Sequence, residues 1–226
     1  MHQLTQQQTI PVPQSLLIDW DYYLSRRRSL LLEEHSLPPY LLKPEITNLL
    51  NATKNDIHHF LINTLWHTGG RISEVLSLTP AHFYFDGKHP EIVLPTLKQK
   101  RGRPKAGAIK QRLLPVYDGD YIEETLRYLA THRRGKHEPL FAISRATADR
   151  WLKAAADTLK AQGSPLSIEV SCHVLRHSFA VNCVLHCVDV PVLQQWLGHK
   201  DRRSTEIYTK VLNAETAHMM TRVVFS

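Results

Sequence analysis

The chain has 226 residues, 42% of them hydrophobic, which suits one medium-sized domain with at most a short extension. Its formal net charge of +7 favours an anionic partner, and nucleic acid fits better than a membrane surface. No apolar run approaches the roughly 20 residues of a bilayer span, and the first residues lack the apolar core of a signal peptide. We therefore expect a soluble, cytoplasmic protein.

Residues 1–38 are predicted to form an N-terminal arm. After a polar start, leucines and Trp20 recur at helical spacing and indicate one or two short helices, which Pro38 ends. The arginines at 26–28 fit two roles equally well, contacts with DNA phosphates or the polar face of a helix.

Residues 39–226 are predicted to form one mainly helical domain. Pro44 stands near a helix start, and Gly69 stands where the next helix closes. The segments with helical spacing are 43–53, 55–70, 71–79, 119–134, 145–163, 172–187, 190–198 and 203–220.

The spacing changes between residues 91 and 116. EIVLPTL and IKQRLLPV are short β-branched or leucine-rich runs, and they flank the strongly basic KQKRGRPK. This order predicts an antiparallel hairpin with a long cationic connection. The expected fold class is therefore α+β and mainly α, a helical bundle with one small antiparallel sheet.

The three cysteines are Cys172, Cys183 and Cys187, all in one late stretch. Their odd number argues against a disulfide framework. Their spacing from the nearby histidines matches no common zinc pattern, so we interpret them as buried thiols and expect no metal.

Two motifs place cations where an anion could bind. HVLRH sets His173, Arg176 and His177 on one face of a mainly apolar helix, where a cationic pair is expected to meet a buried anion. TGGRISEVLSL sets Arg71 at a helix start, with Glu74 one turn later to orient its guanidinium or a histidine. Taken alone, the Arg71–Glu74 spacing also fits an ordinary surface ion pair.

A third motif, LGHKDRRSTEIYTKV, has His199 after a helix end and Tyr208 nine residues later. A lone tyrosine on a helix is usually a core residue. In chain order, however, the first arginine, a hairpin lysine, His-x-x-Arg-His, Leu-Gly-His and the tyrosine form a compound pattern. In this pattern, over about residues 40–212, the chain resembles the tyrosine recombinase (phage integrase) family, and it is most similar to the short enterobacterial plasmid multimer resolvases.

The resemblance implies a tyrosine-recombinase catalytic domain that cleaves and rejoins DNA through a covalent 3′-phosphotyrosyl intermediate, without ATP, metal or cofactor. Tyr208 would be the nucleophile, whose high phenol pKa calls for a proton acceptor or a cationic setting. Arg71 and Arg176 would clamp the non-bridging phosphate oxygens. His173 would be the base or hydrogen-bond partner, and His199 a transition-state donor.

Supporting roles in this scheme go to Glu74 and His177. In the family a hairpin lysine protonates the departing 5′-oxygen; Lys98 is our first choice for it and Lys100 the second. The side chains expected to contact DNA are Lys98, Lys100, Arg101, Arg103, Lys105 and Arg202.

The partners expected are double-stranded recombination sites, bound by a homotetramer on two sites, with a monomer free in solution. Plasmid multimer resolution in a bacterial cytoplasm is favoured over integration, excision or inversion. The sequence departs from the family pattern in two places: Gly70 replaces a more usual apolar residue, and the short arm stands in place of a full core-binding domain.

Two other functions stay open. A non-catalytic DNA-binding regulator could keep the same fold, although the intact set of arginines, histidines and tyrosine argues against decay. A type IB topoisomerase shares the nucleophile and the cations, although the compact size and the spacing of His199 and Tyr208 fit recombinases better.

Overall fold

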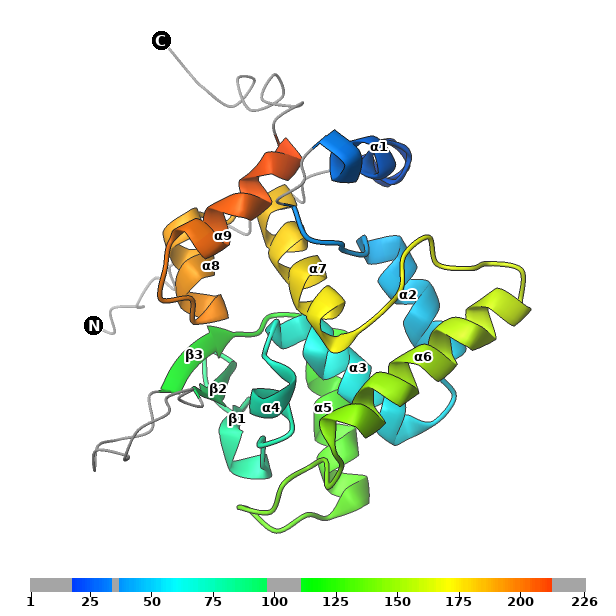
Figure 1. The fold of residues 1–226 in the computed structure, drawn as a ribbon. Coiled ribbons are helices and arrows are strands. Elements are labelled where there is room, and N and C mark those ends of the chain that lie inside the picture. Colours follow the sequence, from blue (N-terminus) through cyan, green and yellow to red (C-terminus); the bar gives the residue numbers. More distant parts are fainter. Residues whose placement is uncertain (1–17, 34–36, 97–110, 213–226) are drawn as a thin grey trace, which may run out of the picture.

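The computed structural model describes residues 18–33, 37–96 and 111–212 (Figure 1). The helices are α1 (Trp20–Glu33), α2 (Lys43–Ala52), α3 (Asp56–Thr68), α4 (Ile72–Val75), α5 (Gly119–His132), α6 (Arg145–Ala161), α7 (Cys172–Leu185), α8 (Val190–Leu197) and α9 (Arg203–Glu206), with 3₁₀-helices η1 (Pro80–His82) and η2 (Ile207–Leu212). The strands are β1 (Phe83–Tyr84), β2 (Glu91–Pro95) and β3 (Gln111–Pro115). The predicted α+β, mainly helical fold is confirmed. None of the described helices is long and apolar enough to cross a membrane.

Helix α7 runs through the middle of the described body, and α3, α6, α8 and η2 contact it (Figure 1). Its apolar run is buried almost from end to end, which explains why this segment carries so few exposed polar residues. Cys172 and Cys183 are buried free thiols on this helix, as predicted, and Cys187 just beyond it is half-buried. The motif HVLRH therefore lies on a largely buried helix.

Polar caps and glycines fix where the helices begin and end. The Ser171 hydroxyl accepts the Val174 N–H at 3.3 Å, so Ser171 caps the N-terminus of α7, whose first residue is Cys172. Gly69 ends α3 with φ of +53°, and an added Cβ there would collide with the ring of Phe179. The close approach of α3 to α7 thus depends on that glycine, and it brings the chain after α3 against the HVLRH helix.

The three strands form an antiparallel sheet in the order β1-β2-β3. Leu94 on β2 pairs with Arg112 on β3, and Ile92 pairs with Leu114. Burial alternates along β3, so that Arg112 and Leu114 face inward while their neighbours are exposed. Strand β1 is an addition to the predicted hairpin, and the hairpin's connection lies outside the described residues.

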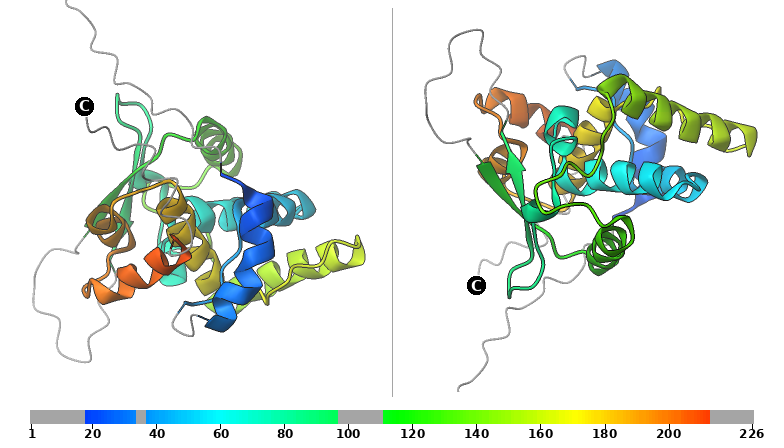
Figure 2. Two further views of the ribbon diagram at one scale, coloured as in Figure 1. Left: turned by 90° about the horizontal axis from the view of Figure 1, so that it is seen from above. Right: turned by 90° about the horizontal axis from the view of Figure 1, so that it is seen from below.

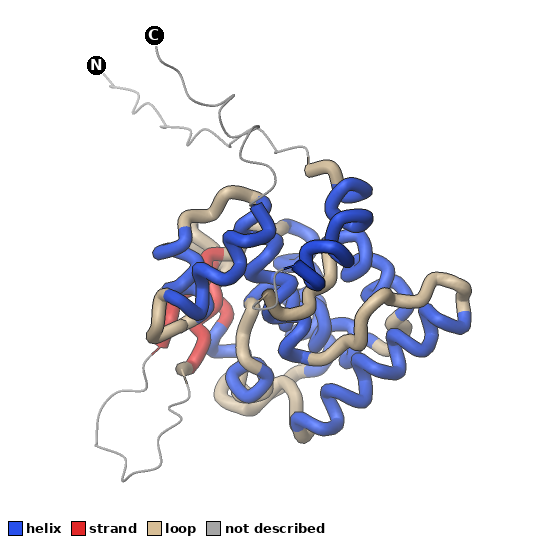
Figure 3. Tube along the Cα trace, turned by 45° about the horizontal axis from the view of Figure 1, so that its top comes forward, coloured by secondary structure: helices blue, strands red, loops and turns tan. Residues whose placement is uncertain are grey.

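The sheet lies on one flank of the body and α6 on the other, as the views from above and below show (Figure 2). The strands gather at one side of an otherwise helical structure (Figure 3). Strand β3 contacts α8, and β2 contacts α4. The base of the hairpin is therefore next to the two elements that precede His199 and follow Arg71.

Helix α1 is joined to the body by the buried apolar side chains of Tyr23 and Leu30 and by a buried arginine. Arg27 is 4% exposed and forms an ion pair with Glu45, to which its Nη2 donates at 2.9 Å. Arg27 also donates to the Tyr40 carbonyl at 3.2 Å and to the Ser167 hydroxyl. Of the two roles weighed for 26–28, Arg27 therefore takes neither, since it is a buried tie between α1 and α2.

Candidate active site

Arg71 stands at the start of α4, directly after the two glycines that end α3. The Glu74 carboxylate reaches back to it: Oε2 accepts the Arg71 backbone N–H at 2.9 Å, and Oε1 accepts from Nη1 at 3.0 Å. The Glu74 side chain is 1% exposed, whereas that of Arg71 is 35% exposed. Glu74 therefore orients the guanidinium, as predicted from their spacing, and leaves part of it open to a ligand.

A second arginine, absent from the sequence-based prediction, binds the same carboxylate. Arg112 donates from Nη2 to Glu74 Oε2 at 2.6 Å and from Nε to the Trp196 carbonyl at 2.7 Å. Burial raises the pKa of Glu74, but the hydrogen bonds and charges of Arg112 and Arg71 outweigh it and hold that pKa below its usual value. Glu74 is therefore an ionised carboxylate shared by two arginines.

Arg176 on α7 is 5% exposed and binds the ends of two helices. Its Nη1 donates to the Gly69 carbonyl at 2.6 Å and its Nη2 to the Leu197 carbonyl at 2.7 Å. The partial negative charge of helix C-termini suits a cation at that position. Burial, together with repulsion from Arg71 and Arg112, lowers the pKa of Arg176 to about 10, so it stays protonated at neutral pH.

His199 follows the end of α8, where Gly198 has φ of +64°. Its Nδ1 lies 2.9 Å from the Thr205 hydroxyl, which orients the ring. Burial and the nearby charges of Arg176 and Arg71 lower the pKa of His199 to about 4. A neutral imidazole beside two guanidinium groups can give or accept a hydrogen bond at neutral pH.

Tyr208 lies in η2, 1% exposed, and η2 packs on α7. Its hydroxyl lies 2.7 Å from His177 Nδ1. Burial raises the pKa of Tyr208 to about 12, against the opposing charge of Arg176. The pKa of His177 is lowered to about 4 by burial and by His173 and Arg176, so both partners are neutral at neutral pH.

His173, the predicted partner of Tyr208, is an exposed residue one turn from His177 on α7. The ring centroids of the two histidines are 6.2 Å apart. Burial and the charges of Arg145 and Arg176 lower the pKa of His173. The structure thus brings the tyrosine hydroxyl to His177, which the sequence had given only a supporting role, and leaves His173 open to solvent.

The predicted DNA contacts divide into two groups. Arg202 is described, with a 66% exposed side chain whose Nε lies 2.7 Å from Glu206 Oε1. The others lie outside the described residues: Lys98, Lys100, Arg101, Arg103 and Lys105. Strand β2, which precedes these five residues in the chain, contacts α4, and strand β3, which follows them, contacts α8.

Among the described residues, three of the predicted groups thus form one electrostatic cluster, in which Arg71 and Arg176 lower the pKa of His199 and Arg71 lowers that of Arg176. A family model described as "Phage integrase family" matches residues 39–215. The chain belongs to the phage integrase family.

Several relatives support this assignment. A "Probable site-specific recombinase in afa region" from Escherichia coli is 36% identical over 202 residues, covering 88% of this chain and 81% of the relative. A "Resolvase" from Escherichia coli K12 is 32% identical over 225 residues, covering 92% and 84%. "Tyrosine recombinase XerA" from Pyrococcus horikoshii is 32% identical over 178 residues, covering 78% of this chain and 58% of that protein.

Solved structures of the family share the fold. The catalytic domain of bacteriophage HP1 integrase aligns with a TM-score of 0.54 and 21% identity, over 82% of this chain and 96% of that domain. XerA recombinase gives 0.61 and 23%, over 83% and 64%. XerH bound to its difH substrate gives 0.60 and 22%, over 81% of this chain and 53% of XerH. This member of the family thus spans about half of the XerH chain.

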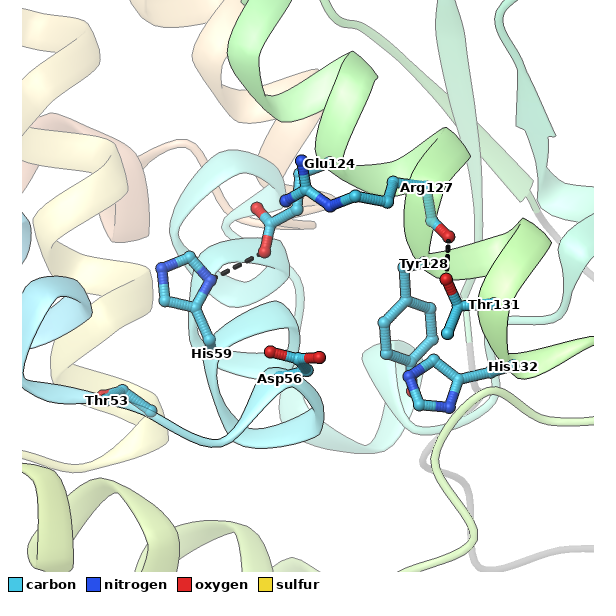
Figure 4. A pocket seen from close by; sticks show the side chains of 8 residues that line it. All are labelled: Thr53, Asp56, His59, Glu124, Arg127, Tyr128, Thr131 and His132. Carbon is cyan, nitrogen blue, oxygen red and sulfur yellow. Dashed lines mark hydrogen bonds and ion pairs between the residues drawn. The ribbon is translucent and has the colours of Figure 1, made fainter.

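A polar hollow of about 270 Å³ between α3 and α5 contains none of the predicted site residues (Figure 4). Its carboxylate Glu124 is paired with His59 at 2.7 Å, and Asn63 donates to the same carboxylate. Within the described ranges, no group of three or more histidine, cysteine or acidic side chains could hold a metal ion. The hollow is separate from the cluster of Arg71, Arg176 and His199.

Arg112 left one signal in the sequence. In QRLLP it occupies an inward-facing position of a half-buried strand, where an apolar residue is expected. A buried cation must be paired, so this position could have indicated a carboxylate partner, although not which one. The hydroxyl contact of His177 left no such signal, because Tyr208 is 31 residues away.

Proposed function

We propose that this protein is a site-specific DNA recombinase in which Tyr208 attacks a DNA phosphodiester. The observation that supports it most directly is that Arg71 and Arg176, from distant parts of the chain, act on His199, while Tyr208 lies within the influence of the same Arg176. Attack by the phenol oxygen forms a 3′-phosphotyrosyl bond and releases the 5′-oxygen, and the reverse attack by another 5′-hydroxyl rejoins the strand. The number of phosphoester bonds is conserved, so the exchange needs no ATP.

The cations would stabilise the pentavalent transition state. Arg71 has an exposed edge that can bind a non-bridging oxygen, and the buried Arg176 supplies a second positive charge. His199 would donate a hydrogen bond to the same phosphate. This assignment leaves Glu74 to hold Arg71 in place, as its two hydrogen bonds to that residue indicate.

Two protons must move in this reaction. The phenol proton would pass to His173, whose exposed ring faces solvent and whose lowered pKa leaves it unprotonated at neutral pH. The departing 5′-oxygen would take its proton from Lys98, with Lys100 as the second choice. His177 would hold the Tyr208 hydroxyl before attack, since that bond is the one present without DNA.

The partner would be double-stranded DNA, with a homotetramer assembled on two recombination sites. Relatives named resolvase in Escherichia coli support plasmid multimer resolution in a bacterial cytoplasm as the biological task. The family match from residue 39 supports a catalytic domain over 39–226 after an arm over 1–38. The exposed guanidinium of Arg202 would contribute to backbone binding.

A covalent adduct tests the proposal. The protein would be incubated with a nicked duplex built on DNA that it selects from a random inverted-repeat pool. We expect a protein–DNA complex that survives denaturation with wild type and is absent with Tyr208→Phe, although this variant still binds. No adduct from wild type on selected, nicked DNA would overturn the proposal. Relaxation of a supercoiled plasmid without that site would indicate a topoisomerase instead.

A further inference from the structure

Arg112 makes hydrogen bonds in three directions from a single buried side chain. Its Nη2 binds Glu74 on α4, and its Nε binds the Trp196 carbonyl on α8. Its Nη1 lies 3.5 Å from the hydroxyl of Thr96, just after β2. The side chain is 5% exposed, so these contacts replace water almost completely. One strand of the sheet is thereby joined to two other parts of the fold.

The chain also makes room for this guanidinium. Gly198 faces it, and an added Cβ would lie 3.3 Å from Arg112 Nη1 and 3.4 Å from Cδ. Gly198 immediately precedes His199, so the turn that carries the histidine rests directly on the arginine. The positive φ of Gly198 and its contact with Arg112 therefore impose two separate demands on the same residue.

The bonds form a closed circuit. Glu74 joins Arg71 to Arg112, and Arg112 holds the last turn of α8. Arg176 holds the next carbonyl of that turn and the carbonyl of Gly69, two residues before Arg71. A break at Arg112 would leave the two halves joined through Arg176 alone, and Glu74 would lose its connection to α8.

We infer that Arg112 is a positioning residue for strand cleavage, which holds the Arg71–Glu74 pair and the His199 turn at a fixed separation. The inference rests on the proposed function. Arg112 reaches the reaction through Glu74 and α8, so it is not itself assigned a contact with the phosphate. It acts by fixing the distance between two groups that must bind one phosphate together.

Only an arginine has the chemistry for this position. Its planar fork can donate to a carboxylate and to a carbonyl at once, and it stays charged when buried. Lysine at this position could keep the charge beside Glu74, but its single nitrogen sits at the end of a flexible stem. An apolar residue would leave Glu74 with Arg71 alone and the Trp196 carbonyl without this donor.

The test measures cleavage separately from DNA binding. Single-turnover adduct formation on the nicked, selected duplex would be measured at saturating DNA for wild type, Arg112→Lys and Arg112→Met. We expect Arg112→Met to slow cleavage about 100-fold, as a displacement of about 1 Å can do, with little change in the dissociation constant for DNA. Arg112→Lys should fall between it and wild type.

A double-substitution cycle with Glu74→Gln identifies the route. If Arg112 acts through Glu74, the two substitutions together should slow cleavage little more than one alone, since interacting residues are not additive. The double variant also removes the buried carboxylate together with one of its two cations, so it serves as a second variant when Arg112→Met alone does not fold. Fully multiplied effects would contradict a route through Glu74.

The chain offers a matched control in Arg27 and Glu45, another buried arginine–glutamate pair. Arg27→Met with Glu45→Gln should destabilise the fold without slowing cleavage by the folded molecules. The inference is overturned when Arg112→Met, or Arg112→Lys if the former does not fold, cleaves at the wild-type rate. It is equally overturned when the control pair is slowed as much. Absence of an adduct from wild type would instead remove the proposed function, and this inference with it.

Discussion

Two buried arginine–glutamate contacts in this protein have similar chemistry and different surroundings. At the arm, Arg27 and Glu45 form one pair, and the remaining donors of Arg27 meet a carbonyl and a hydroxyl of the protein. At the site, Glu74 binds both Arg71 and Arg112. The first contact is balanced in charge, whereas the second is short of negative charge.

The imbalance grows when Arg176 is included. It lies close enough to Arg71 and Arg112 for their charges to lower its pKa, so three guanidinium groups lie near one carboxylate that binds two of them. Guanidinium groups that repel one another lower the stability of the fold. Such an arrangement is expected where a bound anion supplies the missing negative charge. The comparison teaches that a buried ion pair indicates an anion-binding site when cations outnumber anions. It indicates a purely structural contact when their numbers match.

The largest effect should separate the two histidines near the nucleophile. His173→Gln should slow cleavage about 10²–10⁴-fold, since it removes the assigned proton acceptor. His177→Gln should cost less, because an amide oxygen can still accept from the Tyr208 hydroxyl. Single-turnover adduct formation with DNA in excess would measure both. The reverse order would transfer the role of base to His177.

Arg71→Ala tests the open edge of the site. Removing one donor to the developing charge should slow cleavage about 10²–10³-fold. Stability should change little, since the side chain is 35% exposed and Glu74 keeps Arg112. Adduct kinetics and thermal unfolding on the same samples would check this. A variant that cleaves normally would remove Arg71 from the phosphate clamp.

Arg27→Met tests the balanced contact. It leaves Glu45 largely buried without its cation, so the free energy of unfolding should fall by about 3–5 kcal/mol. Cleavage per folded molecule should be unchanged. Urea denaturation would give the stability, with the exposed neighbour Arg28→Met as the control that loses little. Slower cleavage by folded Arg27→Met would show that the two regions are coupled.

The smallest effect is on acid stability. His177 and His199 have their pKa lowered to about 4 in the folded protein, below the usual 6.5, so the unfolded chain binds more protons. Their contribution to stability is complete above pH 6.5 and is lost as pH falls toward 4. The loss is at most about 1.4 kcal/mol per pH unit for each histidine, and less where solvent reaches the ring.

His199→Asn should flatten this dependence between pH 6.5 and 4. Thermal unfolding at several pH values would measure the difference. If the stability of His199→Asn depends on pH as steeply as that of wild type, burial and the surrounding arginines do not lower the pKa of His199.

The sequence predicted those parts of the site that depend on order along the chain. Arg71, Arg176, His199 and Tyr208 belong to short motifs with fixed spacing, and the glycines that shape the motif ends are local as well. The helical periods similarly predicted most helices. These features need little knowledge of how distant segments pack.

The sequence patterns did not predict the contacts between segments that are distant in the chain. Arg112 meets a carbonyl 84 residues away, and its partner is set by strand register and by the way α8 lies on the sheet. Arg27 was ambiguous because its hydrogen bond to Ser167 spans 140 residues. Periodicity shows which face of an element is apolar, but it does not show which other element covers that face.

The short helix that carries Tyr208, the proposed nucleophile, bears on the rate of the proposed reaction. η2 is a 3₁₀-helix of six residues, Ile207–Leu212, whereas such runs seldom exceed about four residues because their hydrogen bonds are poorly aligned. Rewinding or unwinding this segment therefore costs little compared with moving α7. Tyr208 thus lies on a short 3₁₀-helix that packs against the longer helix α7. Substitutions in η2 that favour the α-helix would change the rate at which Tyr208 reacts, while the affinity for DNA stays the same.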